Sequence, residues 1–256
     1  MLWHASEIKG YAIEASDGDI GTVSDFLFDD ASWLVRWLVV DTGDWLSGRK
    51  VLLPTPALGQ PHANNRVFAV KLTKQQIKDS PEIDTDRPVL RQMETSVYEH
   101  YGWSPYWGSG LSMDGYGYVP TSGMPSPYLS VQAREQKIVE AQSDRDIVHQ
   151  RSAEEVTGYH IHASDGEIGH VEDFLLEDTD WSICYLVVDT KNWWPGKKIL
   201  VSSRSAGKIS WTDRLVNLNV DRQRIKDSPA YDPSMTIDRA YDEKFQTYYG
   251  IKSAAA

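Results

Sequence analysis

The sequence predicts a mainly β protein with added helices, in which two small β-barrels form a pseudo-two-fold pair. Three observations carry this prediction: one long stretch is repeated, its apolar runs are short and separated by glycine turns, and its longest run changes parity midway. The repeat is ungapped, since Gly10 matches Gly158 and Asp41 matches Asp189, each 148 residues further on (158 − 10 and 189 − 41). Solenoid repeats have periods of roughly 20–50 residues, so a repeat of about 100 residues indicates a duplicated domain.

The register of the repeat sets the expected domain boundaries. It continues through residues 75–81, which match residues 223–229. We therefore assign residues 1–102 to copy 1 and residues 151–252 to copy 2. Residues 103–150 form a linker that is first rich in aromatic residues, glycine and proline, and then charged.

Alternation of apolar and polar residues predicts five strands in copy 1. Asp17-Gly18 lies between the first two, and Asp-Gly favours a hairpin because glycine readily takes the positive φ of such turns. Short strands with glycine turns are typical of a small closed barrel. The expected strands are residues 10–15, 20–28, 33–41, 50–53 and 66–72, with residues 1–9 as a lead-in.

The second expected strand carries a bulge. Val23 is followed by Phe26 and Phe28, and copy 2 changes parity at the same place, between Val171 and Phe174. A change of parity indicates one extra residue that bends the strand. A glycine two residues before each valine eases the same bend.

Helices are expected to cover part of each barrel. Residues 33–41 become apolar on both faces, so we expect one face inside the barrel and the other under a helix. Thr73 and Gln76 have the spacing of a capping box, and Asp221 is a capping residue at the matching turn. A further helix is expected over residues 88–101.

Charge, cysteine content and the length of apolar runs disfavour several classes of function. The net charge of −11 and the lack of Lys/Arg clusters disfavour binding to nucleic acid or to an acidic membrane surface. A single cysteine, Cys184, excludes an internal disulfide and fits a buried structural residue better than a reactive thiol. No apolar stretch reaches 18 residues, and Glu7 and Lys9 interrupt any signal peptide, so we expect a cytoplasmic protein.

Both copies resemble the PRC-barrel domain family. The resemblance rests on S-D-G-[DE]-I-G-x-V-x-D-F-L from Ser16 and Ser164, and on W-x(4)-L-V-V-D-T from Trp33 and Trp181, followed by G-[RK]-K-[VI]-L. It implies a barrel similar to the cytoplasmic domain of the photosynthetic reaction-centre H subunit and to the C-terminal domain of RimM. This chain has neither the H subunit's membrane helix nor RimM's other β-domain. The resemblance therefore implies a docking or scaffolding surface rather than either role.

Two polar groupings invite a metal-site interpretation. The acidic residues repeat between the copies, and carboxylates suit Ca²⁺ or Mg²⁺, but turn residues and solvated strand edges are the preferred explanation. His160, His162 and His170 form a possible three-imidazole face, but copy 1 has no histidines there, so solvated strand residues are preferred. The acidic residues are Asp17, Asp19 and Asp25 in copy 1, and Asp165, Glu167 and Asp173 in copy 2.

Aromatic residues are the strongest candidates for partner binding. Trp and Tyr either anchor a partner or pack back as lids, and the sequence leaves both alternatives open. Linker aromatics, Tyr116 and Tyr118 among them, are expected to be buried between paired copies, since each small barrel leaves apolar surface to cover. The candidate partner-binding residues are Trp45, Trp193, Trp194, Trp103, Tyr106 and Trp107.

The sequence therefore predicts a protein-binding or scaffolding module with an unidentified protein partner. No catalytic motif appears, so no enzyme, catalytic residue, cofactor or metal site is predicted. One alternative is a small-molecule- or metal-binding, enzyme-like protein that uses the acidic turns. Another is an H-subunit-like protein that docks on a membrane complex.

The metal alternative has a direct test. We expect EDTA, Ca²⁺ and Zn²⁺ to leave the melting temperature unchanged in differential scanning fluorimetry. A metal bound only by the folded state would add about 2.7 kcal/mol at a hundredfold excess over Kd. A rise of several degrees in the melting temperature with any one metal would support a metal site at the acidic turns.

Overall fold

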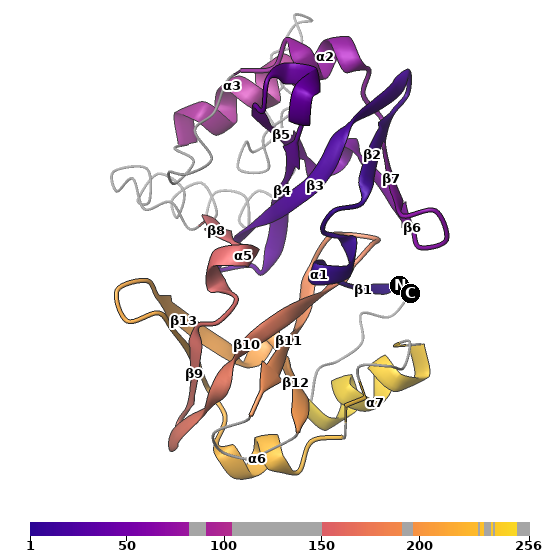
Figure 1. Cartoon of the computed structure of the whole chain (residues 1–256). Helices are drawn as coiled ribbons and strands as arrows, with labels where there is room; N and C mark the ends of the chain where they lie inside the picture. Colours follow the sequence, from indigo (N-terminus) through magenta and orange to yellow (C-terminus); the bar gives the residue numbers. More distant parts are fainter. Residues whose placement is uncertain are drawn as a thin grey trace, which may run out of the picture. The chain divides into compact units, whose positions relative to one another are not determined.

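The computed structural model describes residues 1–81, 91–103, 150–190, 197–229, 231–232, 237 and 239–249. Residues 1–78 and 149–256 form one compact unit, which holds copy 2 and the first 78 residues of copy 1, and residues 79–148 form another. Figure 1 labels most of the strands and α-helices. Each unit is described by itself.

Copy 1 forms a strongly bent sheet in the order β5-β4-β3-β2-β7-β6. The parallel pairing of β2 with β7 joins its first and last hairpins, and its other pairs are antiparallel. Its elements are β1 (Leu2–His4), α1 (Ala5–Ile8), β2 (Ala12–Ala15), β3 (Gly18–Asp29), β4 (Leu34–Asp41), η1 (Gly43–Leu46), β5 (Lys50–Pro54), η2 (Thr55–Ala57), β6 (Leu58–His62), β7 (Val67–Val70) and α2 (Lys74–Lys78).

Copy 2 repeats this order as β12-β11-β10-β9-β14-β13. The mainly β fold with two matching barrel-like sheets and added helices is therefore confirmed. Its elements are β8 (Gln150–Ser152), α5 (Ala153–Val156), β9 (His160–Ala163), β10 (Gly166–Glu177), β11 (Ile183–Asp189), β12 (Lys198–Ser202), η3 (Ser203–Ser205), β13 (Ala206–Ser210), β14 (Leu215–Leu218), α6 (Arg222–Lys226) and α7 (Arg239–Tyr249).

The sequence missed two strands and one α-helix of copy 1. The five expected strands correspond to β2, β3, β4, β5 and β7, but β6 was overlooked because its sequence, LGQPH, contains a glycine and a proline. Residues 1–9 are not a lead-in, because they contain β1 and α1. Both elements are too short to show a periodic pattern.

The predicted bulge is confirmed in both copies. The pairing of β3 with β4 shifts register between Val23 and Asp25, and that of β10 with β11 shifts between Val171 and Asp173. An extra residue at this point bends a strand and increases its twist. Because of this bend, β3 and β10 remain paired with their neighbours on both sides of the bulge while the sheet curves.

The predicted helix starts are also confirmed. Thr73 Oγ1 accepts from the Gln76 backbone N–H at 3.2 Å, while Gln76 Oε1 accepts from the Thr73 N–H at 2.9 Å, which is a capping box. Asp221 caps α6 by accepting from the Arg224 N–H at 2.7 Å. In the second unit, α3 (Arg91–Tyr101) matches the expected helix within the described residues, and Gly102 ends it at φ +71°.

In copy 2, the strand equivalent to residues 33–41 has one face under a helix. Tyr185 and Val187 of β11 belong to a buried cluster with Phe245 and Tyr249 of α7. The Tyr249 hydroxyl also donates to the Leu200 carbonyl oxygen at 2.9 Å. Cys184 is half-buried against this cluster, so it lies partly within the apolar interior.

A glycine next to each bulge allows two strands to approach closely. Gly21 has φ +145°, and a Cβ there would lie 2.0 Å from the Asp41 carbonyl oxygen. Gly169 has φ +147°, and its Cβ would lie 2.0 Å from the Asp189 carbonyl oxygen. A side chain at either position would therefore force the paired strand away.

This contact predicts a large cost for one added methyl group. We expect Gly21→Ala to lower the free energy of unfolding by about 3 kcal/mol or more, because it combines backbone strain with a clash. Gly10→Ala is the matched control, since Gly10 has φ +80° but open space around it. It should cost only about 1 kcal/mol. Equal losses in urea unfolding would contradict the close-approach explanation.

Candidate functional site

The two copies are joined by an exchange of their first strands. β1 of copy 1 pairs with β10 of copy 2, and β8 of copy 2 pairs with β3 of copy 1. The registers are equivalent: Leu2 pairs with Glu177, and Gln150 pairs with Asp29, so each partner is shifted by 148 (150 − 2 and 177 − 29). This reciprocity is the mark of a two-fold contact, here inside one chain.

A carboxylate at each bulge holds the helix that the other copy donates. Asp173 Oδ1 accepts from the backbone N–H of Ser6 at 3.1 Å, and Asp25 Oδ1 accepts from the N–H of Glu154 at 3.0 Å. Ser6 and Glu154 lie in the first turns of α1 and α5, where backbone N–H groups have no partner inside the helix. Each aspartate therefore caps a helix of the other copy.

The second oxygen of each carboxylate is also engaged across the copies. Asp173 Oδ2 lies 2.8 Å from His4 Nδ1 and accepts from the Ser6 hydroxyl at 2.5 Å. Asp25 Oδ2 accepts from the Ser152 hydroxyl at 2.5 Å. His4 and Ser152 are equivalent positions (152 − 4 = 148). An imidazole therefore contacts the aspartate in one half of the interface, and a hydroxyl group contacts it in the other.

His4 also makes a hydrogen bond to a tyrosine, which the equivalent Ser152 does not make in the described residues. Its Nε2 lies 2.8 Å from the Tyr231 hydroxyl, while Nδ1 meets Asp173, so both ring nitrogens are hydrogen-bonded. Burial, followed by the negative charge of Asp173, raises the pKa of Tyr231 above its usual range. Through these two hydrogen bonds, His4 connects β1 to Asp173 and Tyr231 of copy 2.

The two aspartates differ electrostatically. Burial raises the pKa of Asp25, and the hydrogen bonds from Ser152 and Glu154 only partly offset that effect. Burial also acts on Asp173, but the hydrogen bonds from His4 and Ser6 outweigh it and lower its pKa. The prediction of a solvated strand edge was wrong for Asp173, which is 8% exposed, while Asp25 is half-buried.

Side-chain hydrogen bonds at the strand ends follow the same symmetry. Arg151 Nε donates to Asp30 at 2.6 Å, and the equivalent Trp3 Nε1 donates to Asp178 at 3.0 Å. A different pair of side chains thus makes an equivalent contact in each half of the interface.

At the centre of the pairing, a turn of each copy meets its equivalent. The Val35 N–H donates to the Trp181 carbonyl at 2.9 Å, and the Ile183 N–H donates to the Trp33 carbonyl at 2.8 Å. The residues between, Leu34 and Ser182, are themselves equivalent and form a single β-bridge. The pseudo-two-fold axis therefore passes between them.

Aromatic side chains fill the space beside this bridge. Trp181 of copy 2 stacks on Phe26 and Phe68 of copy 1, at centroid distances of 6.4 and 5.2 Å. Phe28 of copy 1 packs against Phe174 of copy 2 at 5.7 Å. The interface between the copies thus has an aromatic centre in addition to the hydrogen bonds of the two aspartates.

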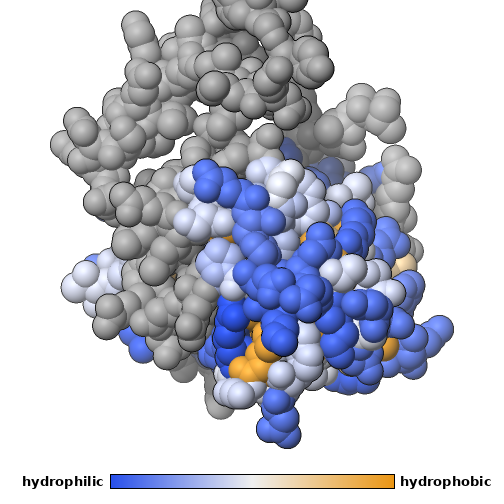
Figure 2. Space-filling model, turned by 90° about the horizontal axis from the view of Figure 1, so that it is seen from above, coloured by the Kyte–Doolittle hydropathy of each residue, from blue (hydrophilic) through white to orange (hydrophobic). Residues whose placement is uncertain are grey.

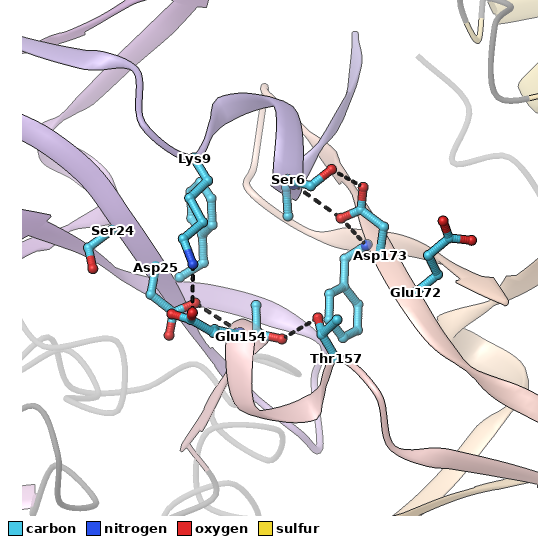
Figure 3. Close-up of a pocket in the computed structure, with 12 residues that line it drawn as sticks. Ser6, Lys9, Ser24, Asp25, Glu154, Thr157, Glu172 and Asp173 are labelled. Atoms are coloured by element: carbon cyan, nitrogen blue, oxygen red, sulfur yellow. Dashed lines mark hydrogen bonds and ion pairs between the residues drawn. The ribbon is translucent and has the colours of Figure 1, made fainter. Parts of the chain in front are cut away.

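A pocket of about 230 Å³ opens where the exchanged helices meet the bulged strands. Figure 3 shows Lys9 pointing to Glu154, and Ser6 pointing to Asp173, on opposite walls. The Lys9–Glu154 ion pair measures 2.7 Å. The lining consists of six equivalent pairs: Ala5/Ala153, Ser6/Glu154, Lys9/Thr157, Ser24/Glu172, Asp25/Asp173 and Phe26/Phe174.

The other acidic residues of the sequence motif serve the ends of the barrels. Asp17 Oδ1 accepts from the Lys74 N–H at 2.7 Å, and the equivalent Asp165 accepts from the Arg222 N–H at 2.8 Å. They are turn residues that also cap α2 and α6, which agrees with the turn interpretation. Asp19 is exposed in the same hairpin.

The histidine face does not come together as a metal site. His160 Nδ1 lies 2.9 Å from Glu167, and His170 Nε2 lies 3.9 Å from Asp189. In the described part of the chain, no three His, Cys, Asp or Glu residues are grouped so that they could hold a metal ion.

Two of the predicted partner-binding residues can be placed. Trp45 lies half-buried on η1, and the Lys74 ammonium is 5.1 Å from its ring centroid. Trp103 is half-buried after α3, 5.7 Å from the Tyr101 ring. The other predicted aromatics lie outside the described residues: Tyr106, Trp107, Tyr116, Tyr118, Trp193 and Trp194.

Substitution of the two aspartates should separate their roles. We expect Asp173→Asn to lower the free energy of unfolding at pH 7 by about 1–3 kcal/mol, because the buried donors of His4 and Ser6 lose an ionised acceptor. Asp25→Asn is the matched control and should be neutral or slightly stabilising. The amide still accepts from Glu154 and removes the cost of a buried charge.

The pH dependence should have opposite signs. Because the pKa of Asp173 is lowered, its contribution is present above the ordinary aspartate pKa, about 3.9, and is lost as the pH falls through the lowered value. Because the pKa of Asp25 is raised, protonation favours the folded state as the pH falls. Equal effects of the two variants in urea titrations from pH 3 to 7 would contradict this assignment.

Comparison with known proteins supports the sequence motif. Residues 4–77 match the model of the PRC-barrel domain. A protein of Deinococcus radiodurans, described only as uncharacterized, is 34% identical over 104 residues, which cover 36% of this chain and 37% of that protein. The alignment thus spans little more than a third of the relative's length. The first copy is therefore similar to the PRC-barrel domain, while the likeness to the H subunit and RimM stays a prediction.

Proposed function

We propose that the paired copies form a non-catalytic scaffold that docks a protein partner through the loop tryptophan Trp45. The observation that carries this proposal is the position of Trp45. It lies on η1 beside α2, half-buried, with Lys74 against its ring. A large aromatic residue that is neither fully covered nor part of the apolar centre is suited to anchor a partner.

The polar site at the axis supports a structural role for the pairing. Asp25 and Asp173 have both oxygens engaged with backbone and side-chain donors of the other copy. A carboxylate held in this way has little freedom to take up and release protons for a substrate. The enzyme-like alternative would need the same groups for catalysis.

The character of the surface fits a polar docking contact. Among the coloured residues of Figure 2, most are hydrophilic or intermediate, and hydrophobic residues appear only as small separate spots. Among the described residues, Met1 is the exposed large hydrophobic residue, at 65%. Interfaces of this kind combine a few aromatic anchors with a polar rim. Within the same described part, no helix has the length and apolar character needed to cross a membrane.

The test separates docking from folding. We expect Trp45→Ala to lose the proteins that an affinity-tagged full chain retains from native lysate, with a melting temperature within about 2 °C of wild type. Loss of packing alone would lower the melting temperature instead. Lys74→Ala is the matched control, because it removes the contact with the ring but keeps the tryptophan and the backbone N–H that meets Asp17.

Two outcomes would contradict the proposal. One is a Trp45→Ala chain that retains the same proteins as wild type. The other is a large fall in melting temperature, which would identify Trp45 as a lid on the barrel.

A further inference from the structure

We infer that the strand exchange seen within one chain also forms between two chains, so that the protein's partner at this surface is a second copy of itself. In this exchanged dimer, copy 1 of each chain pairs with copy 2 of the other. The proposal goes beyond docking through Trp45, since it concerns the interface between the copies.

The contacts of the interface do not depend on how the copies are connected. They join residues 2–9 and 150–157 to the bulged strands β10 and β3, and they join the two central turns. Among the described residues, none of these contacts involves residues 79–81 or 91–103, which lie between the two sets. An isologous surface of this kind is self-complementary wherever its two halves come from.

The free energies of the two arrangements are close. Two separate chains contain two such interfaces, and one exchanged dimer also contains two, so the burial of Phe26 and Trp181 and the aspartate caps cancel. What remains is the advantage of the covalent link, which corresponds to an effective concentration of about 1 mM for tethered modules. The dissociation constant of the exchanged dimer should therefore be of this order.

Interconversion should be slow because it requires the interface to open. β1 and β8 must leave their sheets, the caps on α1 and α5 must break, and Trp181 must leave its place between Phe26 and Phe68. Opening of a buried interface resembles partial unfolding, which takes minutes to days for many domains. A dimer formed at high concentration should thus survive dilution long enough to be measured.

The first experiment is refolding of the full chain from urea at several concentrations, followed by size-exclusion chromatography with light scattering. We expect a few per cent of dimer after refolding at ~10 µM and about half after refolding at ~1 mM. Chains that are wholly monomeric after refolding at the highest concentration would overturn the proposal.

The second experiment shows which copies are paired. Leu34 and Ser182 are direct partners flanked by the hydrogen bonds of Val35 and Ile183, which makes them a pair without mutual hydrogen bonds. Cα atoms in such pairs lie about 4.5 Å apart, within the range of a disulfide. Leu34→Cys with Ser182→Cys, in a Cys184→Ser background, should give looped monomers from the monomer peak and covalent dimers from the dimer peak on non-reducing gels.

Controls make each outcome decisive. The Cys184→Ser chain alone should reproduce the wild-type refolding series, since Cys184 is the single cysteine. Leu2→Cys with Glu177→Cys provides an independent pair on β1 and β10, in case the central turn does not tolerate substitution. A dimer peak whose disulfides remain within single chains would show ordinary association and would also overturn the proposal.

Discussion

The capping of each donated helix by an aspartate of the other copy is the interaction on which the paired structure depends. β1 and β8 are three residues long, and strands of that length have little stability of their own. The helices that follow them are single turns with unsatisfied N–H groups. Asp25 and Asp173 satisfy these groups and so anchor both exchanged segments.

The same local feature of the sequence produces both the curvature and the interface. The bulge that bends β3 places Asp25 beside the register shift, and the bulge of β10 does the same for Asp173. A regular strand would alternate its side chains through this point. The extra residue therefore bends the sheet and directs the carboxylate toward the neighbouring copy.

Duplication explains why the interface is symmetrical, and divergence explains its differences. Equivalent positions make equivalent contacts with different side chains, as His4 and Ser152 do with Asp173 and Asp25. These replacements leave the backbone pairing intact but shift the pKa of the two carboxyl groups in opposite directions. These contacts make the axis a structural joint between the two copies.

The sequence alone determined what depends on neighbours along the chain: the duplicated unit, the five strands with alternating patterns, the bulges and the helix caps. These features follow from local geometry, which residues a few positions apart can specify. Only the tertiary structure decided that the first strand of each copy joins the other sheet and that Asp25 and Asp173 are interface residues. Their partners lie more than a hundred residues away, and neither a three-residue strand nor a single carboxylate carries a pattern that identifies a distant partner.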